Sequence, residues 1–310
     1  MRSSSFASQC FCILWLLGFT VNGQVQPKPE SFYAGVQRAI IQLQYLDQSH
    51  NRLHTATGFF VRKGDTVYVV TAGHVARDSF SYTATVRILI SDGTMLGAHL
   101  TMPHENWVLH PEDGDATHAP IDVAAMKIAE HGGIRVYWYC PSECPDQKGN
   151  IKLAKEDAEP PLRVLVFGFP SNEPGLKLLR SVPMGRQGII ALMDTKEDEV
   201  QVEGGKYFDR RGYVVDVPTS IGGNSGSPVL SNAPLQEQSI VGLVSGSTQT
   251  GDPGAYARAP GYAIAEPVSR IKEVLDSSRI EKMQPVDTWC LVSETDVKKF
   301  KPPAPFPVCQ

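Results

Sequence analysis

The sequence predicts an all-β protein, built as a barrel or a sandwich. Three observations support this fold class. Short segments rich in Val and Ile recur along most of the 310 residues. Gly, Pro, Asn or Asp bound these segments, as turn residues bound short strands. The long helices that alternate with strands in an α/β fold do not occur in the pattern.

The predicted strands can be followed in order along the chain. In the first half they are Ala39–Tyr45, Thr57–Val61, Thr66–Thr71, Thr85–Ile90 and Asp122–Ile128. In the second half they are Leu162–Phe169, Gly188–Met193, Tyr213–Val217, Ser227–Leu230, Ile240–Gly246 and Tyr262–Ala265. The tetrapeptide KGDT, at Lys63–Thr66, predicts a hairpin turn.

One helix is predicted, over Glu266–Met283. Its apolar residues Val268, Ile271, Val274 and Leu275 fall on one face, and Pro267 suits the first helical position. The charged residues of this segment are interpreted as a solvated face. The residues after it, 284–310, carry several prolines and two cysteines, and we expect a disulfide-pinned tail there.

The N-terminus predicts a secretory signal peptide. Arg2 precedes an apolar run at Cys10–Val21, which is too short for a comfortable membrane span. We expect cleavage after Gly23, a flexible lead-in over residues 24–35 and a folded domain over residues 36–283. The mature protein is therefore expected to be secreted or periplasmic and to have no membrane anchor.

Composition narrows the possible partners and the redox environment. The chain is 42% hydrophobic with a formal net charge of −4, and no basic run indicates nucleic acid binding. No feature of the sequence indicates an oligomeric state. An even number of cysteines in an exported chain favours disulfides. The local pairing, one of three possible connectivities, joins Cys140 to Cys144 and Cys290 to Cys309.

A serine in a glycine-rich turn is the first candidate for chemistry. Ser225 lies in the stretch IGGNSGSPVL, and a serine hydroxyl is a weak nucleophile unless a base takes its proton. All eight histidines precede Ser225, which excludes the order of an α/β-hydrolase and leaves the order His, Asp, Ser. His74 follows the strand-like TVYVVTAG, and Asp122 opens the strand-like DVAAMKI. Taken singly, each of these two residues is more consistent with a structural role than with a catalytic one.

The three motifs TAGHV, DVAAMKI and GNSGSPV together resemble those of chymotrypsin-like, or trypsin-like, serine peptidases. Bacterial exported members, such as glutamyl endopeptidases and HtrA protease domains, are the most similar in appearance. The resemblance implies two six-stranded antiparallel β-barrels and hydrolysis of a protein or peptide substrate. It assigns Ser225 as nucleophile, His74 as general base, Asp122 as the group that orients the imidazole, and the amides of Gly223 and Ser225 as the oxyanion hole.

The same resemblance points to the residues that would bind substrate. Thr219 and Ser220 would form the floor of the primary pocket, and Val244, Ser245 and Gly246 its wall. None of these side chains is charged, so the resemblance implies a preference for a small or medium uncharged side chain. Ser245 and its neighbours are also expected to pair with the substrate backbone as an added strand.

No cofactor and no metal are expected. The loop with His104, His110, His118, Asp113 and Asp115 has spacings that fit no compact metal site. Two other functions stay open at this level. One is a binding protein that keeps the peptidase fold without turnover, and the other is a serine esterase.

Overall fold

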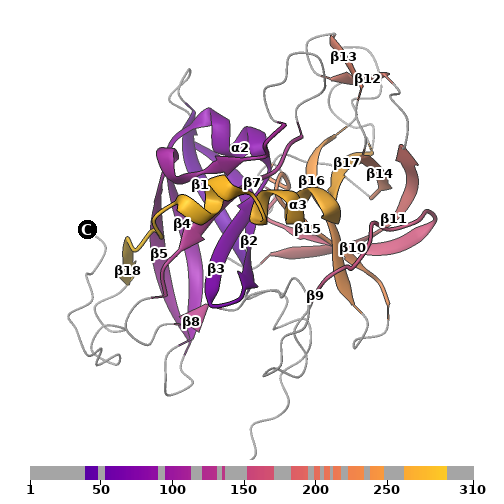
Figure 1. Ribbon diagram of the computed structural model, residues 1–310. Helices are drawn as coiled ribbons and strands as arrows, with labels where there is room; N and C mark the ends of the chain where they lie inside the picture. The colour runs from indigo at the N-terminus through magenta and orange to yellow at the C-terminus, as the bar shows by residue number, and fades with distance from the viewer. Residues whose placement is uncertain are drawn as a thin grey trace, which may run out of the picture. The chain divides into compact units, whose positions relative to one another are not determined.

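A computed structural model gives the fold of this protein (Figure 1). It describes residues 39–47, 53–89, 95–112, 121–130, 135–136, 152–170, 183–194, 199–202, 206–209, 212–217, 223–233, 238–247 and 262–291. The expected signal peptide, the lead-in and Cys140, Cys144 and Cys309 lie outside these residues. The predicted disulfide pairing and signal cleavage therefore stay predictions.

The N-terminal half forms one antiparallel sheet, with neighbours in the order β18-β5-β4-β1-β2-β3-β7-β6 and with β8 paired to β4. Its strands are β1 (Ile40–Asp47), β2 (Leu53–Lys63), β3 (Thr66–Thr71), β4 (Ser79–Leu89), β5 (Met95–Pro103), β6 (Val108–Leu109), β7 (Ala124–Ile128), β8 (Arg135–Val136) and β18 (Trp289–Leu291). Two short helices, α2 (Gly73–Asp78) and the 3-10 helix η1 (His104–Asn106), connect strands of this sheet.

The hairpin predicted at KGDT is confirmed. Lys63 at the end of β2 pairs with Thr66 at the start of β3, so two residues make the turn. Gly64 adopts a φ of +59°, in the left-handed region that favours glycine. This tight turn fixes the register of β2 against β3, and both strands lead toward functional residues.

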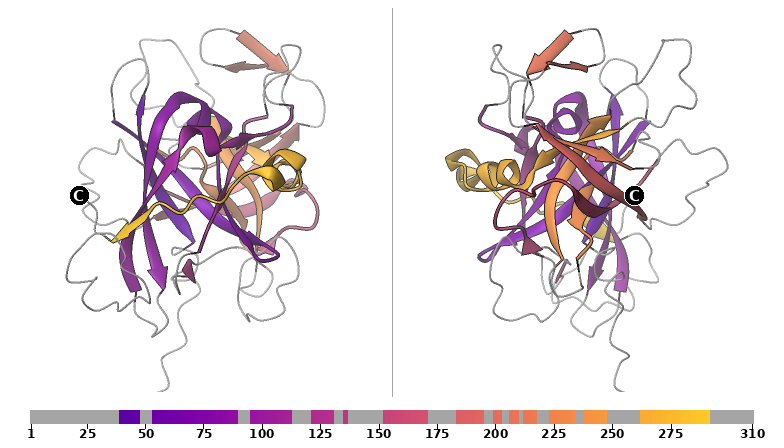
Figure 2. Two further views of the ribbon diagram at one scale, coloured as in Figure 1. Left: turned by 60° about the vertical axis from the view of Figure 1, so that its left-hand side comes forward. Right: turned by 90° about the vertical axis from the view of Figure 1, so that its right-hand side faces the viewer.

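The C-terminal half closes into a six-stranded antiparallel barrel. The order is β15-β10-β11-β14-β17-β16, and an additional β15–β16 pairing completes the ring. Its strands are β10 (Leu162–Gly168), β11 (Met184–Asp194), β14 (Gly212–Asp216), β15 (Pro228–Ser231), β16 (Ser239–Ser247) and β17 (Ala263–Pro267). The short β9 (Lys152–Leu153) joins β16 in parallel, and β12 (Glu199–Val202) pairs with β13 (Lys206–Asp209) as a separate hairpin. Colour distinguishes the two halves in Figure 2.

The predicted all-β fold is therefore present, with one difference in detail. The closed six-stranded barrel lies in the C-terminal half. In the N-terminal half, the pairings among the described residues run from β18 to β6 and form no ring. β18, from the segment expected to be a tail, extends this sheet by pairing with β5.

The predicted helix is interrupted. α3 (Val268–Leu275) and α4 (Ser278–Lys282) replace the single helix, because Ser277 caps α4 by accepting a hydrogen bond from the Ile280 amide. Glu266 and Pro267 belong to β17, so α3 begins two residues later than expected. The predicted apolar face of α3 is confirmed, since all four of its apolar residues are buried.

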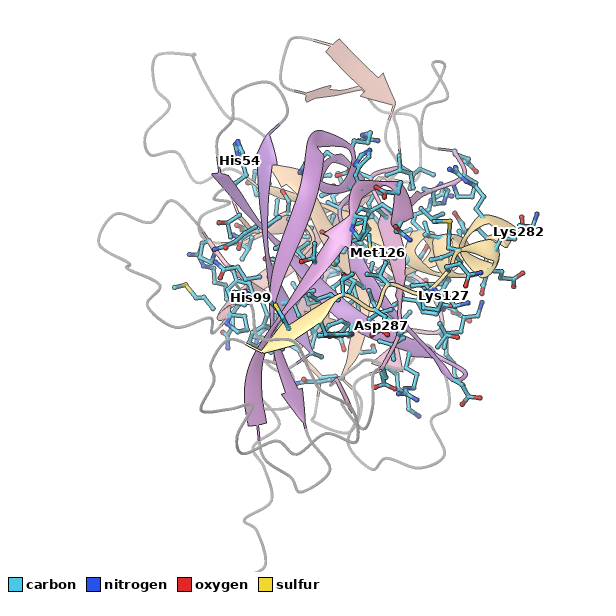
Figure 3. The ribbon with its side chains drawn as sticks, turned by 90° about the vertical axis from the view of Figure 1, so that its left-hand side faces the viewer. His54, His99, Met126, Lys127, Lys282 and Asp287 are labelled. Carbon is cyan, nitrogen blue, oxygen red and sulfur yellow. The ribbon has the colours of Figure 1, made fainter. Side chains whose placement is uncertain are left out.

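A shared core joins the two halves. One cluster of buried residues combines strands of the N-terminal sheet with Phe167 and Phe169 from the end of β10 and with the apolar face of α3. A second, smaller cluster fills the C-terminal barrel around Tyr213. On β7, Met126 is fully buried and Lys127 is half-buried, as the alternation of a strand requires (Figure 3). Among the described residues, no helix is long and apolar enough to cross a membrane.

Candidate active site

The candidate histidine and aspartate lie where two paired strands meet at one edge of the N-terminal sheet. β3 ends at Thr71, and His74 lies in the first turn of the helix α2 that follows. Asp122 lies two residues before β7, whose first residue, Ala124, pairs with Thr71 in antiparallel register. Continuing this register brings His74 opposite the residue next to Asp122. The β3–β7 pairing therefore explains why residues 48 apart in sequence meet.

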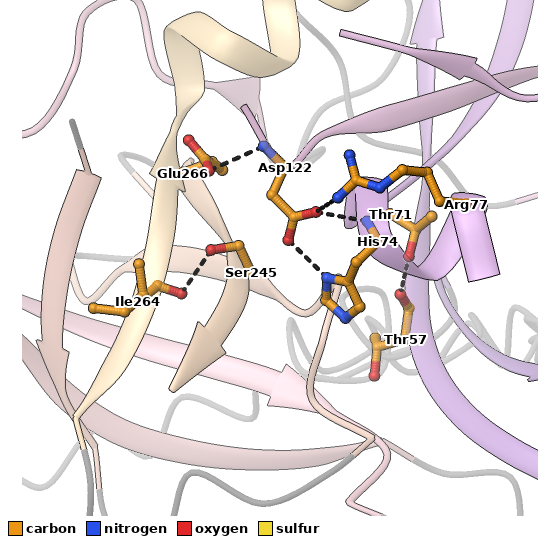
Figure 4. A network of polar contacts seen from close by, with 8 residues as sticks. All are labelled: Thr57, Thr71, His74, Arg77, Asp122, Ser245, Ile264 and Glu266. Carbon is orange, nitrogen blue, oxygen red and sulfur yellow. Dashed lines mark hydrogen bonds and ion pairs between the residues drawn. The ribbon is translucent and has the colours of Figure 1, made fainter. Parts of the chain in front are cut away.

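Asp122 holds His74 by two hydrogen bonds. The Asp122 Oδ2 atom lies 2.7 Å from the His74 ring Nδ1, and Oδ1 accepts the His74 backbone N–H at 2.6 Å (Figure 4). The Asp122 side chain is only 7% exposed, whereas the His74 side chain is 34% exposed. A carboxylate at Nδ1 favours the tautomer with the proton on that nitrogen, which leaves the Nε2 lone pair as the basic site.

Three neighbouring residues fix the position of Asp122. Arg77, one turn after His74 on α2, places its Nη2 atom 3.3 Å from Asp122 Oδ1. The backbone N–H of Asp122 donates to Glu266 Oε1 at 3.1 Å, and Glu266 is 1% exposed. A Cβ on Gly73 would lie 3.1 Å from Asp122 Oδ1, so the small residue before His74 lets the carboxylate approach. Figure 4 shows Arg77 and Glu266 on either side of Asp122.

Ser225 lies in a tight loop that precedes β15. Gly223 has a φ of +95° and Gly226 a φ of +84°, which are values that residues with a side chain rarely adopt. The Ser227 amide donates to the Asn224 carbonyl at 2.9 Å and closes a turn around Ser225. Ser225 is half-buried, whereas the residues on either side of it are buried. The glycines of the motif are thus required by the backbone path of this loop.

Hydrogen bonds attach this loop to both halves of the protein. From β2, the Thr57 amide donates to the Ser225 carbonyl at 2.9 Å, and the Thr57 hydroxyl donates to the Gly223 carbonyl at 2.8 Å. From β16, Val244 accepts the Gly226 amide at 2.7 Å and donates to the Ser227 carbonyl at 2.8 Å. The loop is therefore held between β2 of the N-terminal sheet and β16 of the C-terminal barrel.

The same residues connect the Ser225 loop to the strand that carries His74. The Thr71 hydroxyl donates to the Thr57 carbonyl at 2.7 Å, and Thr71 lies three residues before His74 (Figure 4). The Ser225 loop and the sheet edge that carries His74 are therefore connected through Thr57 and Thr71.

A comparison with protein-family models identifies the family of this chain. The chain matches the family model described as Trypsin over residues 30–270. The chain belongs to the trypsin family. This trypsin-family protein is accordingly a chymotrypsin-like serine endopeptidase, which acts on peptide or protein substrates. A search of curated protein sequences finds no match.

Two solved structures are among those that align with this chain. The active form of the Rv3671c protease from M. tuberculosis is 16% identical, with a TM-score of 0.47, and the alignment covers 83% of this chain and 87% of that one. The HtrA-type protease AlgW with a tripeptide is 17% identical, with a TM-score of 0.48, and the alignment covers 83% of this chain and 65% of that one.

The residues expected to bind substrate in this trypsin-family protein divide into two groups. Thr219 and Ser220 lie outside the described residues. Val244, Ser245 and Gly246 lie on β16, where the pairing with β17 shifts register. The side chains of Val244 and Ser245 are buried, and the Ser245 hydroxyl donates to the Ile264 carbonyl at 3.3 Å. Because the Val244 amide and carbonyl both bind the Ser225 loop, Val244 supports that loop directly.

Sequence reasoning missed Thr57, Arg77 and Glu266. Two of them carried a detectable signal. Thr57 is a polar residue that opens the apolar run TGFFV, and Glu266 is a charge at the end of the apolar run YAIA. A polar group buried in such a segment needs a hydrogen-bond partner, which marks it as a candidate for a structural or functional contact. Arg77 carried no such signal, because it is a part-exposed charge on a short helix, where charges are ordinary.

The histidines and aspartates considered for a metal are not gathered into a site in the part of the chain that the structure describes. His118, Asp113 and Asp115 lie outside that part. His110 is buried, and its Nε2 lies 2.6 Å from Glu273 Oε2 on α3. Among the described residues, no three His, Cys, Asp or Glu side chains come close enough together to hold a metal ion.

Proposed function

We propose that this protein is an exported endopeptidase that uses Ser225, His74 and Asp122 as a catalytic triad. The observation that carries the proposal is that the Asp122 carboxylate accepts two hydrogen bonds from His74, one from its backbone N–H and one from its ring Nδ1. A second observation supports it. Hydrogen bonds through Thr57 and Thr71 connect the Ser225 loop to the edge of the N-terminal sheet that carries His74 and Asp122.

The proposed reaction has two halves. In the first, the Ser225 Oγ attacks the peptide carbonyl, its proton passes to His74 Nε2, and the tetrahedral intermediate collapses to an acyl-enzyme as His74 protonates the departing amine. In the second, His74 takes a proton from water as the water oxygen attacks the ester, and the imidazolium then returns the proton to Ser225 Oγ as the carboxylic acid product leaves. Asp122 keeps the imidazole oriented and stabilises its positive charge throughout.

The amides of Gly223 and Ser225 would bind the negative oxygen of each tetrahedral intermediate. Removal of one such donor in this class of enzyme costs about 3–4 kcal/mol of transition-state stabilisation. Both residues belong to the loop in which Gly223 and Gly226 adopt positive φ values. That backbone path supports the assignment, because two converging amides require a turn that ordinary residues resist.

We also propose that the protein is made with a signal peptide cleaved after Gly23, and that its cysteines form disulfides after export. The positive residue and the apolar run before Gly23 support export. N-terminal sequencing of protein recovered outside the cytoplasm tests this proposal. A mature chain that still begins at Met1 would contradict it.

A fluorophosphonate probe tests the catalytic proposal, since it reacts only with an activated serine. We expect labelling at Ser225, as mapped by peptide mass spectrometry, and hydrolysis of casein. Ser225→Ala and His74→Ala should abolish both. His110→Ala is the matched control, because His110 also pairs with a carboxylate, and this variant should still be labelled.

The two alternatives predict different results. A binding protein that has lost turnover would remain unlabelled although correctly folded. A serine esterase would be labelled and would cleave small esters without cleaving casein or any peptide of a diverse library. Labelling at a serine other than Ser225 would reject the assigned nucleophile.

A further inference from the structure

Thr57 is a buried polar residue in which every backbone and side-chain polar group is engaged. It lies on β2 and is 0% exposed. Its amide donates to the Ser225 carbonyl at 2.9 Å, and its carbonyl accepts the Thr71 hydroxyl at 2.7 Å. Its own hydroxyl donates to the Gly223 carbonyl at 2.8 Å and accepts the Phe169 amide at 3.0 Å. One residue thus contacts the Ser225 loop twice.

The hydroxyl is the part of Thr57 that depends on residue type. Any residue at this position would supply the backbone amide and carbonyl. Only Thr or Ser supplies a hydroxyl that donates one proton to the Gly223 carbonyl while accepting from Phe169. Because the Phe169 amide approaches from one side, the single hydroxyl proton is directed toward the Gly223 carbonyl.

The two contacts from Thr57 hold the segment that carries the oxyanion amides. A peptide group is planar, so fixing a carbonyl fixes the N–H on the other side of the same plane. The contacts to the Gly223 and Ser225 carbonyls fix the peptide planes that follow these two residues. The peptide that contains the Ser225 N–H lies between those two planes and is constrained at both ends. Without the hydroxyl, one end of the segment loses its anchor.

We propose that the Thr57 hydroxyl is a positioning group for the oxyanion hole, acting through the Gly223 carbonyl. This inference rests on the catalytic role proposed above for Ser225. Oxyanion donors stabilise the transition state more than the bound substrate, so misplacing them lowers kcat and leaves KM nearly unchanged. A purely structural role would instead lower thermal stability and leave kcat per folded molecule intact.

Three substitutions at Thr57 separate the hydroxyl from the backbone contacts. Thr57→Val keeps the shape and removes the hydroxyl, Thr57→Ala removes it with a smaller side chain, and Thr57→Ser retains it. We expect kcat toward a casein-derived peptide to fall about 10- to 100-fold in the Val and Ala variants, a smaller loss than deletion of a donor. KM should stay within about twofold, and Thr57→Ser should restore most of kcat.

A peptide aldehyde supplies a second readout, because its covalent adduct with the nucleophilic serine presents an oxyanion to the same amides. Its inhibition constant should rise in parallel with the loss of kcat. Tyr213→Phe is the control for lost stability, because it also removes a buried hydroxyl that accepts a backbone amide, that of Ala158 at 2.5 Å. This variant should melt at a lower temperature and keep the kcat and the aldehyde affinity of the unmodified protein.

The results distinguish this inference from the proposed function. If the unmodified protein is not labelled by a fluorophosphonate, the proposed function itself fails. If it is labelled and active but Thr57→Val or Thr57→Ala keeps full kcat and aldehyde affinity, only the positioning role is overturned. A rise in KM with unchanged kcat would also overturn it, since that pattern indicates lost substrate binding.

Discussion

Replacing Gly226 by alanine should displace the Ser225 loop. A Cβ there would lie 2.0 Å from the Thr57 carbonyl oxygen and 2.3 Å from the Thr71 hydroxyl, whereas real Cβ contacts essentially never fall under 3.0 Å. The loop and β2 must therefore separate by about 1 Å, and a shift of that size can cost about 100-fold in rate. We expect a comparable loss of kcat/KM toward a casein-derived peptide.

The cost in stability can be worked from the same geometry. Gly226 has a φ of +84°, and forcing a residue with a side chain into the left-handed region costs about 1–2 kcal/mol. Overpacking against backbone adds about 1–3 kcal/mol. The total is about 2–5 kcal/mol, which corresponds to a melting temperature lower by roughly 5–20 °C for a domain of this size.

Gly64→Ala is the matched control. Gly64 also has a positive φ, +59°, but no atom lies within 4 Å of the added Cβ. This variant should carry only the backbone strain of about 1–2 kcal/mol and should keep the kcat/KM of the unmodified protein. The reasoning would be refuted if Gly226→Ala hydrolysed the peptide at the normal rate, or if both variants lost activity equally.

Three further outcomes follow from other contacts. Arg77→Gln removes the contact of Arg77 with the Asp122 carboxylate and should lower kcat/KM toward the peptide by only a few-fold, as expected for a part-exposed ion pair, whereas Arg77→Lys should keep most of it. His110→Ala breaks the buried contact to Glu273 and should cost about 1.5–3 kcal/mol in thermal or urea unfolding, with kcat/KM unchanged. Burial raises the pKa of Tyr213 from 10.0 to about 12, so the stability that depends on its protonated hydroxyl should be lost as pH rises from 10 to 12. In Tyr213→Phe, urea unfolding across that range should show a weaker dependence on pH.

The sequence predicted those parts of the fold that leave a local pattern. Each predicted strand is present in the structure, because a run of Val and Ile between turn residues carries its own periodicity. The turn at Gly64 and the buried face of α3 are also confirmed, because a turn tetrapeptide and a helical spacing of apolar residues are local patterns too. β5 was missed because MLGAHLTMP mixes Gly and His into its apolar residues and does not read as a regular strand.

Long-range pairing could not be predicted from local patterns. β18 joins β5 through pairs such as Cys290 with His99, although the two strands lie far apart in the sequence (Figure 3). Val286 and Trp289, within the segment expected to be a tail, are buried against the N-terminal sheet. Such contacts depend on which sheet edge the folded chain leaves open, and no short window of sequence contains that information.

In the candidate site, too, local sequence patterns predict the positions of single residues but not the contacts between distant ones. The positions of His74 and Asp122 at strand ends could be predicted, since each follows or opens an apolar run. Their contact needed the β3–β7 pairing, and the anchoring of the Ser225 loop needed the contact of Thr57 on β2 with that loop. The residues around Thr57 in the sequence show that it is a polar residue in an apolar run, but they do not show that its partner is a carbonyl of the distant Ser225 loop.

Two histidine–carboxylate pairs among the residues that the structure describes, His74 with Asp122 and His110 with Glu273, lie in different environments. His110 Nε2 donates to Glu273, while its Nδ1 accepts the Glu112 amide at 3.2 Å, and its side chain is 2% exposed. Both ring nitrogens of His110 are therefore hydrogen-bonded within the protein. His74 contacts Asp122 through Nδ1, and its side chain is 34% exposed. A general base needs a nitrogen that a reacting hydroxyl can reach. This difference in exposure is the reason for proposing His74 rather than His110 as the general base, and for expecting His110→Ala to affect stability and not turnover.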